Sequence, residues 1–107
     1  MSTQVMFTGT AKNDLREIAV HLAKRSGSRE LAVRFVRELQ EQTAILAQFA
    51  ESGAFPQDRM LKSSSFRFLT HKDYLLFYRY ERAEGRVYIM AIFHGRRDYL
   101  RVIQQYL

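Results

Sequence analysis

The 107-residue sequence has no cysteine and only one proline. Without cysteine the chain can form no disulfide, no thiolate nucleophile and no zinc or iron–sulfur site with thiolate ligands. It has no apolar run long enough to cross a bilayer, and its first residues lack the basic and apolar regions of a secretory signal. We therefore expect a single domain, residues 1–107, located in the cytoplasm and without membrane contact.

The charge of the chain is unevenly distributed. Seventeen Lys and Arg face eleven Asp and Glu, for a net charge of +6. Residues 1–57 hold seven basic and six acidic side chains, a net +1, whereas residues 58–107 hold ten and five, a net +5. Such a field attracts polyanions, either nucleic acid or an acidic protein partner. A basic surface that serves only solubility explains the charge equally well.

Two amphipathic helices are predicted in the first half of the chain, after a short strand at Gln4–Thr8. Thr10 is placed to cap the first helix and Gly27 to end it, while Ser28 is placed to cap the second. The short link between them predicts an antiparallel helical hairpin. Apolar residues at helical spacing form the two stripes, which are Ala11, Leu15, Ile18, Ala19 and Leu22, then Leu31, Ala32, Phe35, Leu39, Leu46 and Phe49.

The second half of the chain has the pattern of a β-sheet. A loop at residues 52–57 ends the helical periodicity, and Gly85 stands where a hairpin needs a positive φ. We expect an α+β fold in the order β-α-α-β-β-β: an N-terminal strand and a two-helix hairpin packed on a small, mostly antiparallel sheet. The three later strands and a short closing helix are predicted at Phe66–Thr70, Tyr74–Tyr80, Val87–Phe93 and Arg96–Leu107.

The last predicted strand is apolar on both faces. Simple alternation places Val87, Ile89, Ala91 and Phe93 on one face, and Tyr88, Met90, Ile92 and His94 on the other. Two helices cover only one face of a sheet, so the other face needs cover of its own. The C-terminal helix supplies it, a partner protein supplies it, or both do.

The side chains best suited to chemistry lie after this strand and on its neighbours, namely His94, Arg96, Arg97, Asp98 and Tyr99, with Arg67, His71, Tyr78 and Arg79. Arginine forms forked hydrogen bonds with phosphate, and imidazole and phenol groups transfer protons, which is what RNA cleavage requires. The alternative is structural. Asp98 then pairs with Arg96 or Arg97 to fix the C-terminal segment, and His94 and Tyr99 pack at the sheet edge.

Other chemistry is not indicated. The three histidines lie far apart in the sequence, so we expect no metal site. No glycine-rich phosphate loop and no nucleophile elbow is present, so we expect no cofactor. The aromatic residues of the strands are expected to form the core rather than a base-stacking platform.

The motifs FRFL, YLLFYRY and VYIMAIFHGRRDYLRVI, after a helical hairpin, resemble the RelE/ParE superfamily of bacterial toxins from type II toxin–antitoxin modules. The resemblance spans Gln4–Ile103 and is most specific in Tyr74–Tyr80 and Ile92–Asp98. It implies a cognate acidic antitoxin that binds and neutralises the toxin in a hetero-oligomer. On the doubly apolar strand, the residues expected to contact this antitoxin are Tyr88, Met90 and Ile92.

The superfamily divides by target. RelE-like members cleave mRNA on the ribosome with a set of cationic residues and a tyrosine. Two of the matching positions here are Leu69 and Leu75, so the cationic set is incomplete. If the chain is an endoribonuclease, its candidate catalytic residues are Arg67, His94, Arg96, Arg97 and Tyr99.

ParE-like members poison DNA gyrase and are not known as catalysts. The segments Phe77–Arg79 and His94–Asp98 are closer to this branch. The resemblance therefore implies a non-catalytic gyrase poison whose target-binding residues are Arg79, His94, Arg96 and Arg97. A ribosome-dependent mRNA endoribonuclease is the alternative. A third hypothesis is a member without toxicity that acts only with its antitoxin in operon autoregulation.

Overall fold

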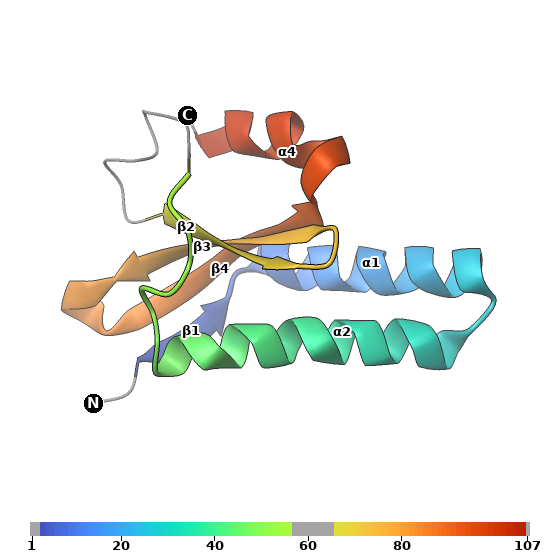
Figure 1. The fold of residues 1–107 in the computed structure, drawn as a ribbon, viewed down its shortest axis with the longest axis horizontal. Helices are drawn as coiled ribbons and strands as arrows, with labels where there is room; N and C mark the ends of the chain where they lie inside the picture. The colour runs from blue at the N-terminus through green and yellow to red at the C-terminus, as the bar shows by residue number, and fades with distance from the viewer. Residues whose placement is uncertain (1–2, 57–65, 107) are drawn as a thin grey trace.

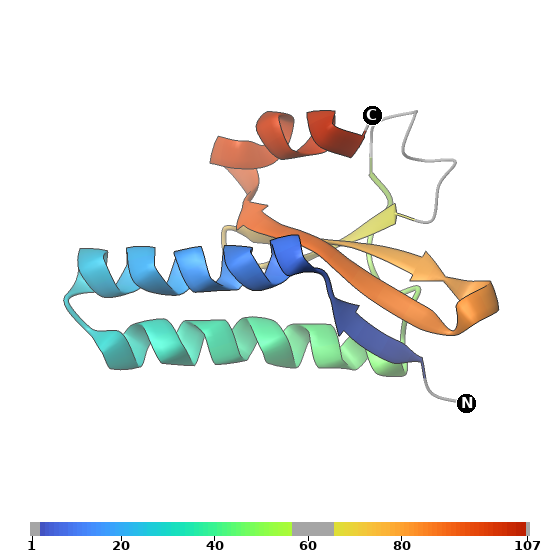
Figure 2. The same cartoon turned by 180° about the vertical axis from the view of Figure 1, so that it is seen from behind.

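A computed structural model describes residues 3–56 and 66–106, and these form a four-stranded sheet with helices on both faces (Figure 1). The elements in chain order are β1 (Gln4–Phe7), α1 (Gly9–Ser26), α2 (Arg29–Ala44), β2 (Phe66–His71), β3 (Tyr74–Glu81), β4 (Arg86–His94) and α4 (Gly95–Ile103). The α1–α2 hairpin lies on one side of the sheet and α4 on the other, as the reverse view also shows (Figure 2). The predicted α+β fold and its element order are confirmed.

The strand order in the sheet is β1-β4-β3-β2. β1 runs parallel to β4, and the other two pairings are antiparallel, so the sheet is mostly antiparallel as predicted. Gly85 adopts a positive φ of 64° in the β3–β4 connection, which is the conformation expected of it. In the part of the chain that is described, no helix has the length and apolar character needed to span a membrane.

Helix α1 begins earlier than predicted because Thr8, not Thr10, is its N-cap. The Thr8 hydroxyl accepts a hydrogen bond from the Ala11 amide at 3.1 Å and donates one to the Ile89 carbonyl at 2.9 Å. One side chain therefore caps the helix and ties its start to β4. The structure confirms that the first helix ends at Gly27, which has a φ of 71°, and that Ser28 caps the second helix.

A β-bulge at Met90 changes which face each residue of β4 presents. Phe77 of β3 lies opposite Ala91, but the next residue, Tyr78, lies opposite Ile89, so Met90 is an extra residue on β4. An extra residue reverses the alternation of side chains beyond it. Ile92 therefore packs with Val87 and Ile89 on the α1–α2 side. The predicted division of this strand into two faces is wrong from Ala91 onward.

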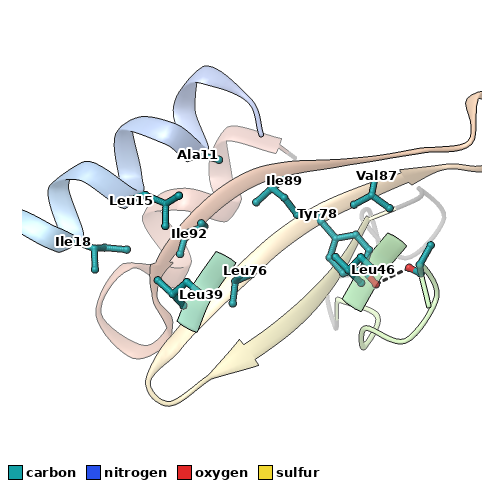
Figure 3. Close-up of a cluster of buried hydrophobic side chains, with 11 residues drawn as sticks. Ala11, Leu15, Ile18, Leu39, Leu46, Leu76, Tyr78, Val87, Ile89 and Ile92 are labelled. Carbon is teal, nitrogen blue, oxygen red and sulfur yellow. Dashed lines mark hydrogen bonds between the residues drawn. The ribbon is translucent and has the colours of Figure 1, made fainter. Parts of the chain in front are cut away.

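Each face of the sheet has its own apolar core. The α1–α2 side buries Ala50 and the residues labelled in Figure 3: Ala11, Leu15, Ile18, Leu39, Leu46, Leu76, Tyr78, Val87, Ile89 and Ile92. The α4 side buries Phe68, Phe77, Ala91, Phe93, Val102 and Ile103. Full burial of one large apolar side chain contributes about 1.5–3 kcal/mol. The C-terminal helix thus supplies cover for the second face, which was one of the two alternatives.

The predicted stripe of the second helix is partly wrong. Ala32 and Leu39 are buried, but Leu31 is 44% exposed and Phe49 is 60% exposed. Leu31 directly precedes Ala32, and neighbouring helical positions point about 100° apart, so both cannot face the sheet. Phe49 lies beyond the end of α2, which stops at Ala44, so the helical spacing no longer applies to it.

Candidate functional site at the start of helix α4

The junction between β4 and α4 is held in a fixed geometry by three contacts. The Gly95 amide donates a hydrogen bond to the Asp73 carbonyl at 2.8 Å. The His94 ring packs edge-on against Tyr74, with ring centroids 5.7 Å apart. A Cβ at position 95 would lie only 3.2 Å from Leu75 Cγ, so a glycine lets the chain pass close to β3 here.

His94 is the N-cap of α4, and this role selects the tautomer of its neutral ring. Its Nδ1 accepts a hydrogen bond from the Arg97 amide at 3.2 Å. An accepting Nδ1 carries no proton, so in the neutral ring the proton sits on Nε2. The His94 ring is partly buried and presents Nε2–H as its donor.

The carboxylate of Asp98 joins two arginines of α4. It lies 3.3 Å from Arg97 Nη2 and 3.7 Å from Arg101 Nη2. The two arginine side chains are 59% and 67% exposed, so these are surface ion pairs worth about 0–1 kcal/mol each. The predicted pairing of Asp98 with Arg97 is confirmed. Arg96 is exposed and makes no ion pair with any residue described.

A cleft of about 280 Å³ lies beside this junction, between α1 and α4. Its walls carry Asp14 and Glu17 from α1 and Arg97 and Arg101 from α4, so the charges are mixed. Asp14 accepts a hydrogen bond from the Ile92 amide at 2.9 Å. Burial raises the pKa of Asp14 above its usual value, although this hydrogen bond opposes the shift.

Arg67 does not contribute to this site, because it is committed to the loop before β2. Its Nη1 donates to the carbonyls of Glu51 at 2.9 Å and Gly53 at 3.1 Å. Its guanidinium also stacks on the Phe55 ring, 4.1 Å from the centroid. The side chain is only 16% exposed. Arg67 therefore fixes a loop and is not open to a phosphate.

The hydroxyl of Tyr78 anchors the same loop from inside the core. It donates to the Ala50 carbonyl at 2.8 Å and accepts from the Gly53 amide at 3.0 Å. Tyr78 is fully buried, and burial raises its pKa. A Cβ at Gly53 would lie 2.5 Å from this hydroxyl, so only glycine fits. Tyr78 is therefore a structural residue.

Two further candidates are also engaged elsewhere. His71 Nε2 lies 2.9 Å from Glu38 Oε1, which links the end of β2 to α2. Arg79 Nε lies 2.9 Å from Glu81 Oε1. Arg79 pairs with Tyr88, which precedes His94 by six positions on β4, so the two ends are about 20 Å apart. Neither residue lies at the β4–α4 junction.

The structure therefore divides the predicted set. It brings together His94, Arg96, Arg97 and Asp98. Tyr99 follows them in α4, but its ring packs toward Phe68, with centroids 6.0 Å apart.

The sequence did not predict that His21 and Tyr74 line the cleft beside Arg97. His21 lies on the face of α1 that turns toward α4. His21 follows Ile18 by one helical turn and so lies at the edge of the buried stripe. This spacing is the feature of the sequence that could have placed it near the cleft.

The three residues predicted to contact an antitoxin do not share a surface. Tyr88 and Met90 are partly exposed, but Ile92 is only 2% exposed and belongs to the core beneath α1. The bulge at Met90 is the reason, because it turns Ile92 to the opposite face. Ile92 is therefore not available to a partner, whereas Tyr88 and Met90 are.

Comparison with known proteins agrees with this geometry. Residues 5–99 match the family model described as ParE toxin of type II toxin-antitoxin system, parDE. No curated protein matches the chain. Among solved structures, a chain of the chromosomal ParDE system from P. aeruginosa is 24% identical with a TM-score of 0.72, and the match covers 87% of this chain and 96% of that one.

A chain of the toxin–antitoxin complex RelBE2 from Mycobacterium tuberculosis is 21% identical with a TM-score of 0.66, over 88% of this chain and 99% of that one. At these identities the two structures establish a shared fold. The family model matches nearly the whole described fold, and this match shows the family to which the chain belongs. The chain belongs to the ParE toxin family of type II toxin–antitoxin systems, within the RelE/ParE superfamily.

Proposed function

We propose that this toxin inhibits growth by poisoning DNA gyrase and that it does not cleave RNA. The observation that carries the proposal is the position of Arg67. It is bound to two loop carbonyls on the α1–α2 side of the sheet, whereas Tyr99 packs on the α4 side. Cleavage of an RNA strand needs a base, an acid and cations around one phosphate. The residues matched to those roles are not gathered around one point.

Leu75 and Leu69 support the same conclusion. Both stand where the ribonuclease branch is expected to carry cations. Leu75 packs against the α4-side core and Leu69 against the α1–α2-side core. These apolar contacts are consistent with positions selected for packing rather than for phosphate binding.

The proposed gyrase-binding surface is the exposed start of α4. Arg96 and Arg97 project from its first turn, and His94 caps it. Arg79, which was also expected to bind the target, lies at the other end of β3 and β4 and is not part of this surface. Mixing purified toxin with gyrase and relaxed plasmid tests the proposal. We expect loss of supercoiling; unchanged supercoiling at saturating toxin rejects it.

A ribonuclease remains the second candidate because His94, Arg96 and Arg97 do lie together. A neutral His94 with its proton on Nε2 can donate a hydrogen bond to a phosphate oxygen that gains negative charge during cleavage. The test is toxin added to ribosomes translating a defined mRNA. The proposal expects intact mRNA, and cuts at codon positions favour this second candidate.

We also propose that an acidic antitoxin binds the α4-side face of the sheet where α4 does not cover it. Figure 1 shows the β3–β4 hairpin extending beyond α4. On this part of the sheet, Met6 lies beside Tyr88, and Tyr88 beside Arg79. Met6 is 43% exposed, and the guanidinium of Arg79, which pairs with Glu81, lies 5.5 Å from the centre of the Tyr88 ring. Such a surface suits an acidic, partly apolar segment.

Electrostatic attraction speeds the encounter of the two proteins, and apolar burial supplies most of the affinity. The association rate with a co-encoded acidic protein should therefore fall as ionic strength rises. A rate that is constant across ionic strengths excludes partner capture by the basic surface. If the toxin fails in both target assays but still binds the antitoxin, the third hypothesis, a non-toxic autoregulatory member, is favoured.

A further inference from the structure

A second hollow, of about 230 Å³, adjoins the junction on the α1–α2 side of the sheet. It lies where the C-terminal half of α1, the β2–β3 turn and the first turn of α4 meet. Its permanent cations are Arg25 from α1, Lys72 from the turn and Arg97 from α4. We call this hollow, with His21 included, the basic hollow. Among the residues that the structure describes, Asp73 is the one carboxylate that lines it.

The cations of the basic hollow differ in how they are already engaged. Lys72 Nζ lies 3.3 Å from Glu38 Oε1, and Arg97 Nη2 lies 3.3 Å from Asp98 Oδ2. Both therefore keep further N–H donors but share their charge with an acid. Arg25 forms no ion pair with any residue that the structure describes. Its five donors and full charge remain available to a ligand.

His21 and Arg25 lie four residues apart on α1, so their side chains share one face of the helix. Across the hollow, Lys72 has a φ of 54°, which sets the tight β2–β3 turn. Its ammonium group also lies 5.4 Å from the centre of the Phe35 ring. The charged residues thus come from α1, the β2–β3 turn and α4 and border one small hollow, which is a better-defined arrangement than scattered surface charge.

We propose that the basic hollow binds a phosphate group. A phosphate presents several oxygens around one centre, and converging Arg, Lys and imidazole donors complement them with charge-assisted hydrogen bonds. The volume is below the roughly 300–1,000 Å³ of sites that enclose a drug-sized ligand, so it suits one phosphate rather than a whole nucleotide. The hollow lies on the α1–α2 side of the sheet, away from the α4-side core. The inference does not depend on which target the toxin attacks.

The test is a titration of the full chain with inorganic phosphate, followed by NMR of the His21 and His94 rings, with sodium chloride at matched ionic strength as the reference. Adenosine monophosphate and a short single-stranded DNA serve as further probes. The variant is Arg25→Gln. Its matched control is Arg16→Gln, which removes the same charge from an exposed site on the same helix outside the hollow.

We expect saturable changes at both rings with phosphate and none with chloride. Arg25→Gln should weaken binding about tenfold, the loss of one charge-assisted hydrogen bond, and Arg16→Gln should leave it unchanged. Competition of all three probes for one site identifies the phosphate group as the recognised part, whether it is free or in nucleic acid. No saturable change, or equal weakening by both variants, overturns the proposal. This readout is independent of toxicity, so it fails or succeeds separately from the gyrase assay.

Discussion

Arg67 and Tyr99 lie on opposite faces of the sheet. Arg67 stands opposite Tyr78, whose side chain is in the core under α1 and α2. Tyr99 packs toward Phe68 in the core under α4. Directly opposed residues of an antiparallel pair share a face, so the backbone of the sheet separates the two side chains. The two side chains therefore do not face one common phosphate, which argues against a ribonuclease site that includes both of them.

Arg67→Ala should therefore reduce stability rather than remove a catalytic cation. It deprives the Glu51 and Gly53 carbonyls of a donor and removes the stacking on Phe55. We expect a loss of about 1–3 kcal/mol in the free energy of unfolding, measured in urea. Arg16→Ala, at an exposed site, should change it by no more than about 0.5 kcal/mol. An Arg67→Ala protein of unchanged stability that has lost toxicity contradicts the structural role.

Tyr78→Phe should be similarly destabilising. It removes the buried hydroxyl that hydrogen-bonds to the Gly53 amide and the Ala50 carbonyl. Each unsatisfied buried group costs about 1–3 kcal/mol. Tyr88→Phe is the matched control, since its hydroxyl donates an exposed hydrogen bond of 3.3 Å to Glu84 at the surface of the hairpin. Thermal unfolding of both variants checks the difference. Equal melting temperatures for the two would show that the loop does not depend on Tyr78.

The sequence predicted the fold well because its signals are local. Gly27 and Ser28 specify the helical hairpin through a left-handed residue and a hydroxyl cap, and both act within one turn. The start of α1 was misplaced because Thr8 is selected partly by its hydrogen bond to Ile89, 81 positions away. No local pattern contains that contact.

The faces of β4 were misassigned for a related reason. The bulge at Met90 depends on the register between β4 and β3. Because β4 is apolar on both faces, its sequence has no polar–apolar alternation from which a bulge could be detected. The candidate site was predicted where its residues are adjacent in sequence, from His94 to Asp98. The loop contacts of Arg67 could not be predicted, because its partners lie in a loop with no recognisable motif.

Arg96→Glu and Arg97→Glu should abolish growth arrest with little loss of stability. Both side chains are exposed at the start of α4, and reversing their charge repels an acidic or phosphate surface. Growth of expressing cells and the melting temperature of each purified variant check this. Variants that remain fully toxic and folded exclude this segment from the target surface.

Asp98→Ala separates the role of the arginines from that of their partner. Its ion pairs lie at the surface, so we expect a loss of no more than about 1 kcal/mol and a folded protein. Early melting of Asp98→Ala, or of the two arginine variants, shows instead that these residues are needed to hold α4.

Stability should fall in acid partly because of Glu38. Hydrogen bonds from His71 and Lys72 hold the pKa of Glu38 below its usual 4.5 in the folded protein. The unfolded chain then binds more protons between the two pKa values, so this contribution is complete above pH 4.5 and is lost as the pH falls through the folded pKa.

Urea unfolding at a series of pH values between about 3 and 6 measures this effect. Glu38→Gln should flatten the fall in stability below pH 4.5. Glu41→Gln, an exposed neighbour on the same helix, should keep the wild-type slope. Identical slopes for the two variants mean that Glu38 is not linked to acid unfolding.

The most direct measurement adds one preparation of purified toxin, at one concentration, to two reactions. One reaction contains gyrase and supercoiled plasmid, and the other contains ribosomes and a translated mRNA. The Arg97→Glu protein serves as the reference in each. Our account predicts that the wild-type toxin traps gyrase-linked DNA breaks, that Arg97→Glu does not, and that the mRNA stays intact. Cleaved mRNA with unaffected gyrase contradicts it.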